Sequence, residues 1–228
     1  MVVGYGRIIP QWMIELPPLG NINLHSSLLP KYRGAAPVQW AIACGETVAG
    51  VSTMRIDAGL DTGDILLQRE VAIAADDTAE TLSPKLAAVG AELMVETLFG
   101  LRKKTVPPQK QDDSRASLAP VLRKEDGRID FSRAAAEVYN RLRGFQPWPG
   151  AYTSFRGKQL LVCSARVVES AGPLSPGSLL VDNNQLLAGC HDSVLELLEV
   201  QPEAKKRMAA RDFINGYRPQ PGEKLGTA

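Results

Sequence analysis

Cysteine, histidine and net charge are all scarce in this sequence. Its 228 residues include three cysteines and two histidines, and the formal net charge is +1. The odd cysteine count, with no closely spaced metal-type pair, favours free thiols in a reducing compartment over a disulfide framework. We therefore expect Cys44, Cys163 and Cys190 to be buried free thiols in a cytoplasmic protein. No apolar run approaches the roughly 18 residues of a membrane span, so no membrane partner is expected.

The near-zero charge also excludes wholesale coating of nucleic acid, although a local basic patch can still grip a phosphate backbone. With 44% hydrophobic residues, the chain is able to form one or two packed domains. The stretch 103–115 is charged, contains two adjacent prolines and lacks an apolar period, so it is predicted to be a linker. The predicted domains are therefore 1–102 and 116–228.

Helical and strand-like patterns alternate in the first domain, which predicts an α/β fold with a partial doubly wound, Rossmann-like sheet. The expected strands are 1–5, 22–25, 48–56 and 65–71, and the expected helices are 11–16, 37–44 and about 77–101. Two starts for the long helix remain open. Asp77 with Glu80 resembles a capping box, whereas Ser83 followed by Pro84 resembles an N-cap and a first helical proline.

The second domain is predicted to be a helix followed by a small β domain. Ser132 is expected to cap a helix that runs through Arg143. Short strand-like segments then follow at 151–155, 159–168, 178–181, 185–188 and 194–200. Five closely spaced strands favour a small barrel of the oligonucleotide-binding (OB) type.

The stretch 21–65 concentrates polar groups suited to acyl transfer. Asn23 and His25 alternate with apolar residues, so both side chains are expected on one face near the end of a strand. Asp61 lies in a glycine-rich loop and supplies a carboxylate, while Ser52 on a neighbouring strand is expected to fix a water molecule. An amide, an imidazole and a carboxylate together provide an oxyanion donor and a proton route. Each also has a structural explanation, as a hydrogen-bonded histidine or a turn aspartate, and spacing alone leaves both readings open.

Several motifs carry a family resemblance that spans nearly the whole chain. The central ones are Asn23-x-His25, 27–30 (SLLP), 32–37 (YRGAAP) and 59–64 (GLDTGD), and further matches lie at 2–10, 145–150 (FQPWPG), 201–202 and 205–208. Together they closely resemble the methionyl-tRNA formyltransferase family, within the formyltetrahydrofolate-dependent transferases.

That resemblance implies a site, a donor and a partner. Asn23, His25 and Asp61 match the catalytic trio. The expected folate contacts are Ser27, Leu28, Leu29 and Pro30, together with Tyr5, Arg7, Ile8, Ile9, Asp57 and Leu60 around the pterin. The implied reaction moves a formyl group from 10-formyltetrahydrofolate, as co-substrate, to the α-amine of methionyl initiator tRNA, without a metal.

The resemblance also implies that the second domain docks tRNA. The residues expected at phosphates are Arg33, Arg141, Arg143, Lys205, Lys206 and Arg207. Without the resemblance, these charges would be read as a solvated face. His191 has no neighbour in the sequence that suggests a catalytic pair, so a structural role is expected.

One departure from the family concerns the amino terminus, because the first strands and helices of the catalytic domain are expected before Met1. An amino-terminally truncated catalytic domain is therefore anticipated, and its activity is an open question. The alternatives are a formyltransferase that acts on an amino-sugar nucleotide or a glycinamide nucleotide, and an inactive tRNA-binding remnant. A monomer is expected.

Overall fold

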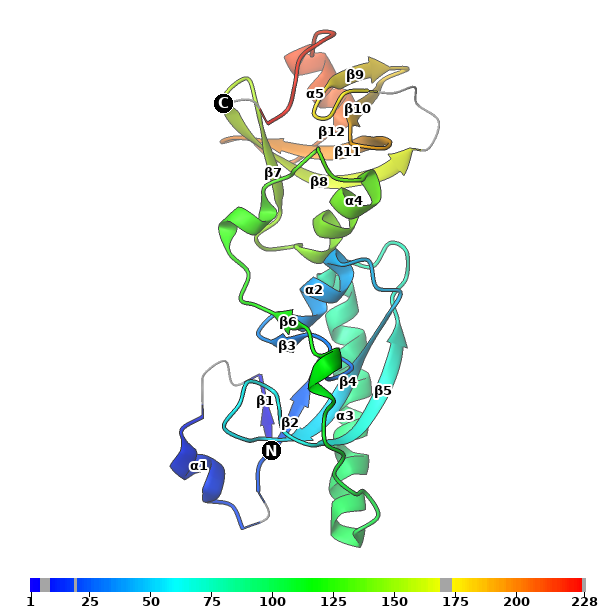
Figure 1. The fold of residues 1–228 in the computed structure, drawn as a ribbon. Helices are drawn as coiled ribbons and strands as arrows, with labels where there is room; N and C mark the ends of the chain where they lie inside the picture. The colour runs from blue at the N-terminus through cyan, green and yellow to red at the C-terminus, as the bar shows by residue number, and fades with distance from the viewer. Residues whose placement is uncertain (5–8, 19, 169–173, 227–228) are drawn as a thin grey trace. The chain divides into compact units, whose positions relative to one another are not determined.

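The chain divides into two compact units. The computed structural model (Figure 1) describes residues 1–4, 9–18, 20–168 and 174–226. The first unit comprises 1–42 and 46–122, and the second comprises 43–45 and 123–228. The boundary therefore falls after Leu122, and the stretch 103–115 belongs to the first unit instead of forming a linker.

The first unit is built on a four-stranded sheet in the order β1-β2-β4-β5. Its strands are β1 (Val2–Val3), β2 (Ile22–His25), β4 (Val48–Arg55) and β5 (Ile65–Ala72). The pairing of β1 with β2 is parallel, whereas β2 with β4 and β4 with β5 are antiparallel. A separate parallel pair joins β3 (Arg33–Gly34) to β6 (Leu118–Ala119). The mixed α/β prediction is confirmed, with the parallel, Rossmann-like part at β1 and β2.

Among its described residues, this unit contains the helices α1 (Gln11–Glu15) and α3 (Ala79–Lys103) and all but the last residue of α2 (Pro37–Ala43). Helix α3 packs against β4 and β5. Neither predicted start of the long helix is correct. Thr78 is the N-cap and exchanges hydrogen bonds with Thr81 in a capping box, while Pro84 lies inside the helix. The sequence analysis missed Thr78, which directly follows the predicted cap residue Asp77.

A buried carboxylate supports the start of α3. Asp77 accepts hydrogen bonds from Ala74 N (2.8 Å), Thr81 Oγ1 (2.7 Å) and Lys85 Nζ (2.7 and 2.9 Å). Burial by itself raises the pKa of Asp77, but the bonds from Lys85, Thr81 and Ala74 outweigh it, so the pKa lies below its ordinary value. The ionised Asp77 carboxylate therefore adds to the free energy of unfolding when the pH is above the ordinary pKa of an aspartate. This stabilisation is lost as the pH falls through the lower pKa that Asp77 has in the folded chain.

Asp77→Asn is expected to destabilise the first unit by about 1–3 kcal/mol at pH 7, because a charged acceptor of buried bonds is removed. The variant should lose less additional stability than the parent chain between pH 5 and pH 2. Urea unfolding at several pH values measures both effects. Asp76→Asn, which removes an exposed neighbouring carboxylate, is the control, and equal pH dependence in parent and Asp77→Asn chains would contradict the assignment.

In the described part of the second unit, the chain forms α4 (Ala135–Gly144), six strands and α5 (Ala210–Tyr217). The strands are β7 (Ala151–Phe155), β8 (Lys158–Val168), β9 (Leu179–Asp182), β10 (Gln185–Gly189), β11 (Val194–Pro202) and β12 (Met208–Ala209). They form an antiparallel sheet in the order β7-β8-β11-β10-β9, with β12 beside β11. All five predicted strands are confirmed, whereas β12 and α5 were not predicted. Short 3-10 turns occur at Asp113–Arg115 in the first unit and at Lys124–Gly127 in the second.

The helix predicted to begin after Ser132 begins later. Ser132 donates its hydroxyl to Asp130 Oδ1 instead (2.5 Å), and the Ala135 N–H at the helix start donates to Asp192 Oδ1 (2.8 Å). The cap is therefore supplied by a residue 57 positions away. A local sequence pattern cannot reveal such a partner.

The cysteines differ in exposure. Cys190 is buried, Cys163 is partly buried and Cys44 is exposed, so the expectation of a buried thiol was wrong for Cys44. Burial, with a smaller effect of the Asp192 charge, raises the pKa of Cys190 to about 12. In the part of the chain that the structure describes, no helix is long and apolar enough to cross a membrane.

Candidate active site

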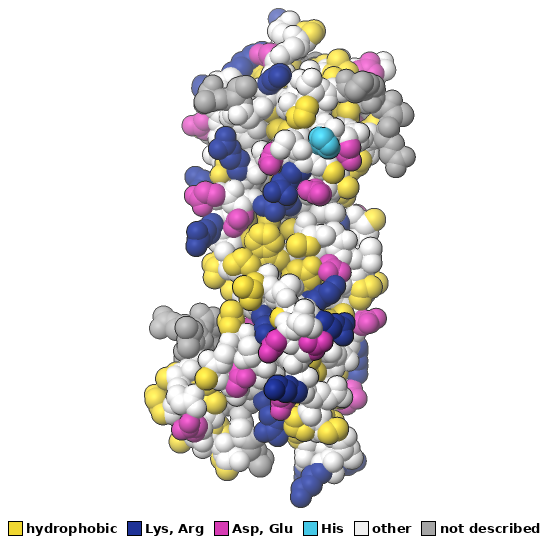
Figure 2. Space-filling view, viewed as in Figure 1, with side chains coloured by type: hydrophobic (Ala, Val, Ile, Leu, Met, Phe, Trp, Pro, Cys, Tyr) yellow, Lys and Arg dark blue, Asp and Glu magenta, His cyan; other side chains and the backbone are white. Residues whose placement is uncertain are grey.

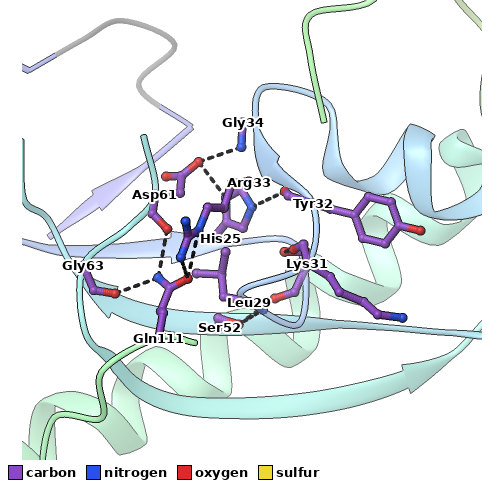
Figure 3. Close-up of polar contacts among 11 residues, drawn as sticks. His25, Leu29, Lys31, Tyr32, Arg33, Gly34, Ser52, Asp61, Gly63 and Gln111 are labelled. Atoms are coloured by element: carbon purple, nitrogen blue, oxygen red, sulfur yellow. Dashed lines mark hydrogen bonds and ion pairs between the residues drawn. The ribbon is translucent and has the colours of Figure 1, made fainter. Parts of the chain in front are cut away.

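His25 is the last residue of β2 and its side chain is buried (Figure 3). Its Nε2 lies 2.9 Å from the carbonyl oxygen of Tyr32. A carbonyl oxygen only accepts hydrogen bonds, so the geometry assigns a proton to Nε2. The other ring nitrogen, Nδ1, is thereby the one that faces Asp61.

Asp61 is brought to His25 from a separate loop. Its Oδ2 lies 3.7 Å from His25 Nδ1 and accepts a hydrogen bond from the Gly34 N–H at 2.9 Å. The Asp61 side chain is 18% exposed, so the pair lies at the edge of the protein interior. The two groups that the sequence placed on different segments therefore meet at one site.

Gly34 allows this approach because its backbone has a φ of +120° and runs against β6. A Cβ atom at this position would lie 2.7 Å from the carbonyl oxygen of Ala119. A side chain would therefore push β3 away from β6 and move the N–H that binds Asp61. This is a physical reason for glycine in the stretch 32–37.

Asn23 is placed near His25 by its position on β2. It lies two residues before His25 on β2 and pairs with Val2 on one side and Met54 on the other. Because side chains alternate along a strand, Asn23 and His25 face the same side of the sheet. Asn23 is half-buried, so its amide is accessible from that side.

The stretch 27–30 is a tightly bonded turn after β2. Ser27 Oγ donates to Lys31 O at 2.6 Å, and the side chain of Leu29 is buried. The Leu28 side chain packs over Gly50, and the Leu29–Pro30 peptide is cis. The backbone of the turn is bonded within the protein as well, because Ser27 O and Leu29 N bond Ser52, Leu29 O accepts from Gln68 Nε2 and Leu28 O accepts from Lys31 N. The turn therefore offers a ligand mainly the partly exposed surfaces of Leu28 and Pro30.

Ser52 is a support of this turn and cannot also hold a catalytic water, so that expectation was wrong. Its hydroxyl donates to Ser27 O (2.6 Å) and accepts from Leu29 N (3.1 Å) and Gln68 Nε2 (2.7 Å). A hydroxyl has one donor and two acceptor sites, so all three are occupied. The residue is 0% exposed.

The other residues expected at the pterin have mixed outcomes. Tyr5, Arg7 and Ile8 lie outside the described residues, and Ile9 is partly buried. Asp57 accepts hydrogen bonds from Gly59 N (3.0 Å) and Thr62 Oγ1 (2.7 Å), so it shapes the loop that carries Asp61. Leu60 in that loop is 60% exposed.

Arg33 is a buried structural residue, and its prediction as a phosphate contact was wrong. Its Nε and Nη2 donate to Gln111 Oε1 at 3.0 and 2.8 Å, and Nη2 also donates to Asp113 Oδ1 at 2.7 Å. Gln111 was missed by the sequence analysis because it lies in the stretch predicted to be a linker. An uncharged polar residue among charged ones was the only local signal.

The residues of the second unit that were predicted to contact phosphates divide into a buried group and an exposed group. Arg143 is buried, lies over the Tyr139 ring and bonds Asn140 Oδ1 at 2.7 Å, so its prediction as a phosphate contact was wrong. Arg141 is half-buried over the Phe145 ring, 4.9 Å from its centroid. Burial, and then the charge of Arg133, lowers the pKa of Arg141.

The second group is solvent-exposed. Lys205, Lys206 and Arg207 lie between β11 and β12, and Arg207 pairs with Glu199. Lys205 and Lys206 are thus exposed to a polyanion, whereas Arg207 already has an acidic partner.

No group of three or more His, Cys, Asp or Glu side chains suited to a metal ion occurs within the described ranges. The chemistry that the site offers is that of an imidazole and a carboxylate beside an amide.

Comparison with known proteins identifies the family. The family model described as formyl transferase matches residues 1–98, and the one described as formyl transferase, C-terminal domain, matches residues 121–218. The fold and the site thus define a formyl transferase. A methionyl-tRNA formyltransferase from Koribacter versatilis is 63% identical over 227 residues, which are 99% of this chain and 72% of that protein. The chain belongs to the methionyl-tRNA formyltransferase family.

Solved structures support the fold. HypX from Aquifex aeolicus in complex with tetrahydrofolic acid is similar with a TM-score of 0.66 and 18% identity, over 97% of this chain and 41% of that chain. A methionyl-tRNA formyltransferase from Clostridium thermocellum is similar with a TM-score of 0.55 and 22% identity, over 72% of this chain and 70% of that chain. At these identities the likeness concerns architecture.

Proposed function

We propose that this chain transfers a formyl group from 10-formyltetrahydrofolate to the α-amine of methionyl initiator tRNA, with His25 and Asp61 as the reacting pair. The observation that carries the proposal is the 3.7 Å approach of His25 Nδ1 to Asp61 Oδ2, with Nε2 tied to the Tyr32 carbonyl. Relatives that bear the name of this activity, such as the Koribacter protein, support the choice of acceptor.

The proposed reaction forms one bond and breaks another at the formyl carbon. The amine nitrogen attacks that carbon, and the bond from the carbon to N10 of the folate breaks. The amine loses one proton and N10 gains one, so no redox partner or metal is required. Negative charge develops on the formyl oxygen between these steps and must be stabilised.

The residues have distinct roles in this scheme. Asn23 donates an amide N–H toward the developing oxyanion, and His25 donates from Nδ1 when both ring nitrogens carry protons. The Asp61 carboxylate accepts the amine proton, directly or through a water molecule. The Tyr32 carbonyl keeps the ring oriented by holding Nε2–H.

The folate is proposed to bind along the turn 27–30 and the loop that carries Asp61. Ser27 and Leu29 are buried and support the turn, whereas Leu28 and Pro30 are partly exposed. Within the expected contact stretch of Ser27, Leu28, Leu29 and Pro30, the folate is therefore expected to touch mainly Leu28 and Pro30. Leu60 offers an exposed apolar surface, and Asp57 keeps its loop in shape. Ile9, which is partly buried, is proposed to line the same pocket. The tetrahydrofolic acid complex of HypX supports the class of donor.

The test is a formyl-transfer assay with purified full chain, 10-formyltetrahydrofolate and one acceptor at a time. Charged methionyl initiator tRNA is expected to be formylated, whereas an amino-sugar nucleotide and a glycinamide nucleotide should not be. Transfer to a sugar nucleotide alone would identify the alternative enzyme. Retained tRNA binding without folate binding, measured by calorimetry, would identify a binding remnant.

The tRNA is proposed to contact the exposed cluster Lys205, Lys206 and Arg207. Arg141, which is half-buried, is proposed as one further phosphate contact. Basic and acidic side chains are interspersed over the face seen in Figure 2, so a small number of phosphate contacts is expected. Lys205→Ala with Lys206→Ala should weaken tRNA binding and reduce the slope of log affinity against log salt by about 2.

Filter binding at several salt concentrations measures this slope. Lys103→Ala with Lys110→Ala removes two exposed charges from the first unit and is the matched control. An unchanged slope in the Lys205 and Lys206 double variant would remove these residues from the interface.

A further inference from the structure

Residues 109–119, which we call the strap, run along the loops that hold the candidate active site. Gln109 exchanges two backbone hydrogen bonds with Ile65, both 2.8 Å long. Ser117 N donates to Pro30 O (3.3 Å) and Ser117 O accepts from Arg33 N (2.8 Å). The strap is thus joined at one end to the loop that carries Asp61 and at the other to the loop after His25.

Two non-glycine residues with positive φ flank the His25 ring. Tyr32 has a φ of +62° and presents its carbonyl to Nε2, while Asp61 has a φ of +53° and presents its carboxylate to Nδ1. Residues with side chains rarely adopt this conformation, and such strain persists only when surrounding contacts hold it. Each of the two residues is held by one side chain of the strap.

Gln111 holds the Asp61 loop. Its Nε2 donates to Asp61 O (2.8 Å) and to Gly63 O (2.7 Å), and its Oε1 accepts from the Arg33 guanidinium (Figure 3). Carbonyls only accept and guanidinium groups only donate, so the amide has one possible orientation. Gln111 is 6% exposed, so water does not compete for these bonds.

Ser117 holds the other flank. Its Oγ accepts the backbone N–H of Tyr32 at 2.9 Å. The next peptide bond of the chain is anchored as well, through Arg33 N and Ser117 O. The Tyr32 carbonyl, which orients the His25 ring, therefore lies between two backbone N–H groups that both donate hydrogen bonds to Ser117.

We propose that Gln111 and Ser117 are positioning residues for the formyl transfer, acting through Asp61 and Tyr32 respectively. The strap sets the distance between His25 Nδ1 and the Asp61 carboxylate without touching the substrate. This inference rests on the proposed function for its kinetic consequence, whereas the structural consequence for His25 does not depend on it.

Gln111→Glu is the sharpest substitution, because it keeps the size of the side chain and its contact with Arg33 but replaces two N–H donors by an oxygen that faces two carbonyls. The Asp61 loop should shift, and kcat should fall by about 10²-fold, as expected for a displacement near 1 Å of a reacting group. The KM for tRNA should change little, because its proposed contacts are residues of the second unit, whereas the KM for the folate should rise, because the shifted loop carries proposed folate contacts. Gln109→Glu makes the same chemical change at an exposed strap position and is the control.

Ser117 offers a conservative rescue. Ser117→Ala removes the acceptor for Tyr32 N and is expected to lower kcat by about 10-fold or more, as is typical for partners that orient a reacting group. Ser117→Thr keeps the hydroxyl at this exposed position and should retain kcat near the parent value. If Gln111→Glu fails to fold, the Ser117 pair carries the test by itself.

A readout independent of activity is the NMR spectrum of the two imidazoles, because the chain has only His25 and His191. His191→Gln assigns the signals. We expect the chemical shifts of the His25 ring to change in Gln111→Glu and in Ser117→Ala. They should be unchanged in the controls Gln109→Glu and Ser117→Thr. The chemical shifts of His191 should be unchanged in all four variants. Unmoved His25 signals together with parental kcat in both disruptive variants would overturn the proposal. A parent chain that transfers no formyl group would instead reject the proposed function, and the NMR comparison would still decide the role of the strap.

Discussion

Asp61→Asn is expected to lower kcat for formyl transfer to methionyl initiator tRNA by about 10²- to 10⁴-fold, the usual range for a lost proton acceptor. The carboxylate lies 3.7 Å from His25 Nδ1 and receives the Gly34 N–H. An amide keeps the shape of the side chain and can still accept from Gly34, but it cannot take the amine proton. The fold should therefore survive while the chemistry fails.

Single-turnover rates with saturating folate and tRNA measure this effect directly. Asp76→Asn makes the same change at an exposed position before α3 and should leave the rate unaltered. His25→Asn should cause a loss of similar size, and the double variant should lose little more than either single one, because the two residues act as a unit. Near-parental turnover in both single variants would refute their roles.

Phe213→Ala is expected to have the largest effect on stability, a loss of about 3–5 kcal/mol in the second unit. Phe213 of α5 is 0% exposed, and its ring lies 5.3 Å from that of Phe155 in an edge arrangement and 4.6 Å from that of Tyr217 in a stacked one. Truncation removes these ring contacts and leaves a cavity between α5 and the sheet. The site residues of the first unit are not touched by the change.

Hydrogen exchange of the amides of β10 and β11, followed during urea titration, reports the stability of the second unit. Phe99→Ala is the matched control, because that ring is 58% exposed on α3 and its loss should change stability by less than about 0.5 kcal/mol. Equal exchange in the two variants would show that α5 contributes little to the core of the second unit.

Local elements were predictable because their signals are short-range. The strands at 22–25, 48–55 and 151–155 appear where alternation or turn residues predicted them, and α3 follows its apolar period. Elements with weak local signals were missed. Helix α5 is eight residues long and follows directly on β12, and its N-cap residue, Ala209, has no side-chain cap bond.

For the candidate site residues, the sequence predicted the local strand or loop in which each one lies, but it did not predict their partners from other segments. The alternation along β2 placed Asn23 and His25 on one face, and the structure agrees. The same local view could not show that Ser52 has no remaining hydrogen-bonding capacity, that Arg33 is buried, or that Gln111 belongs to the site. Each of these outcomes depends on a partner remote in the sequence.

The amino-acid sequence by itself determined the kinds of chemical group available and the order of strands, helices and turns, because backbone sterics and side-chain periodicity act over a few residues. Tertiary structure alone decided which polar groups meet. Asp61 reaches His25, and Gln111 reaches Asp61 across 50 positions, because a buried polar group must find its partner wherever packing brings one.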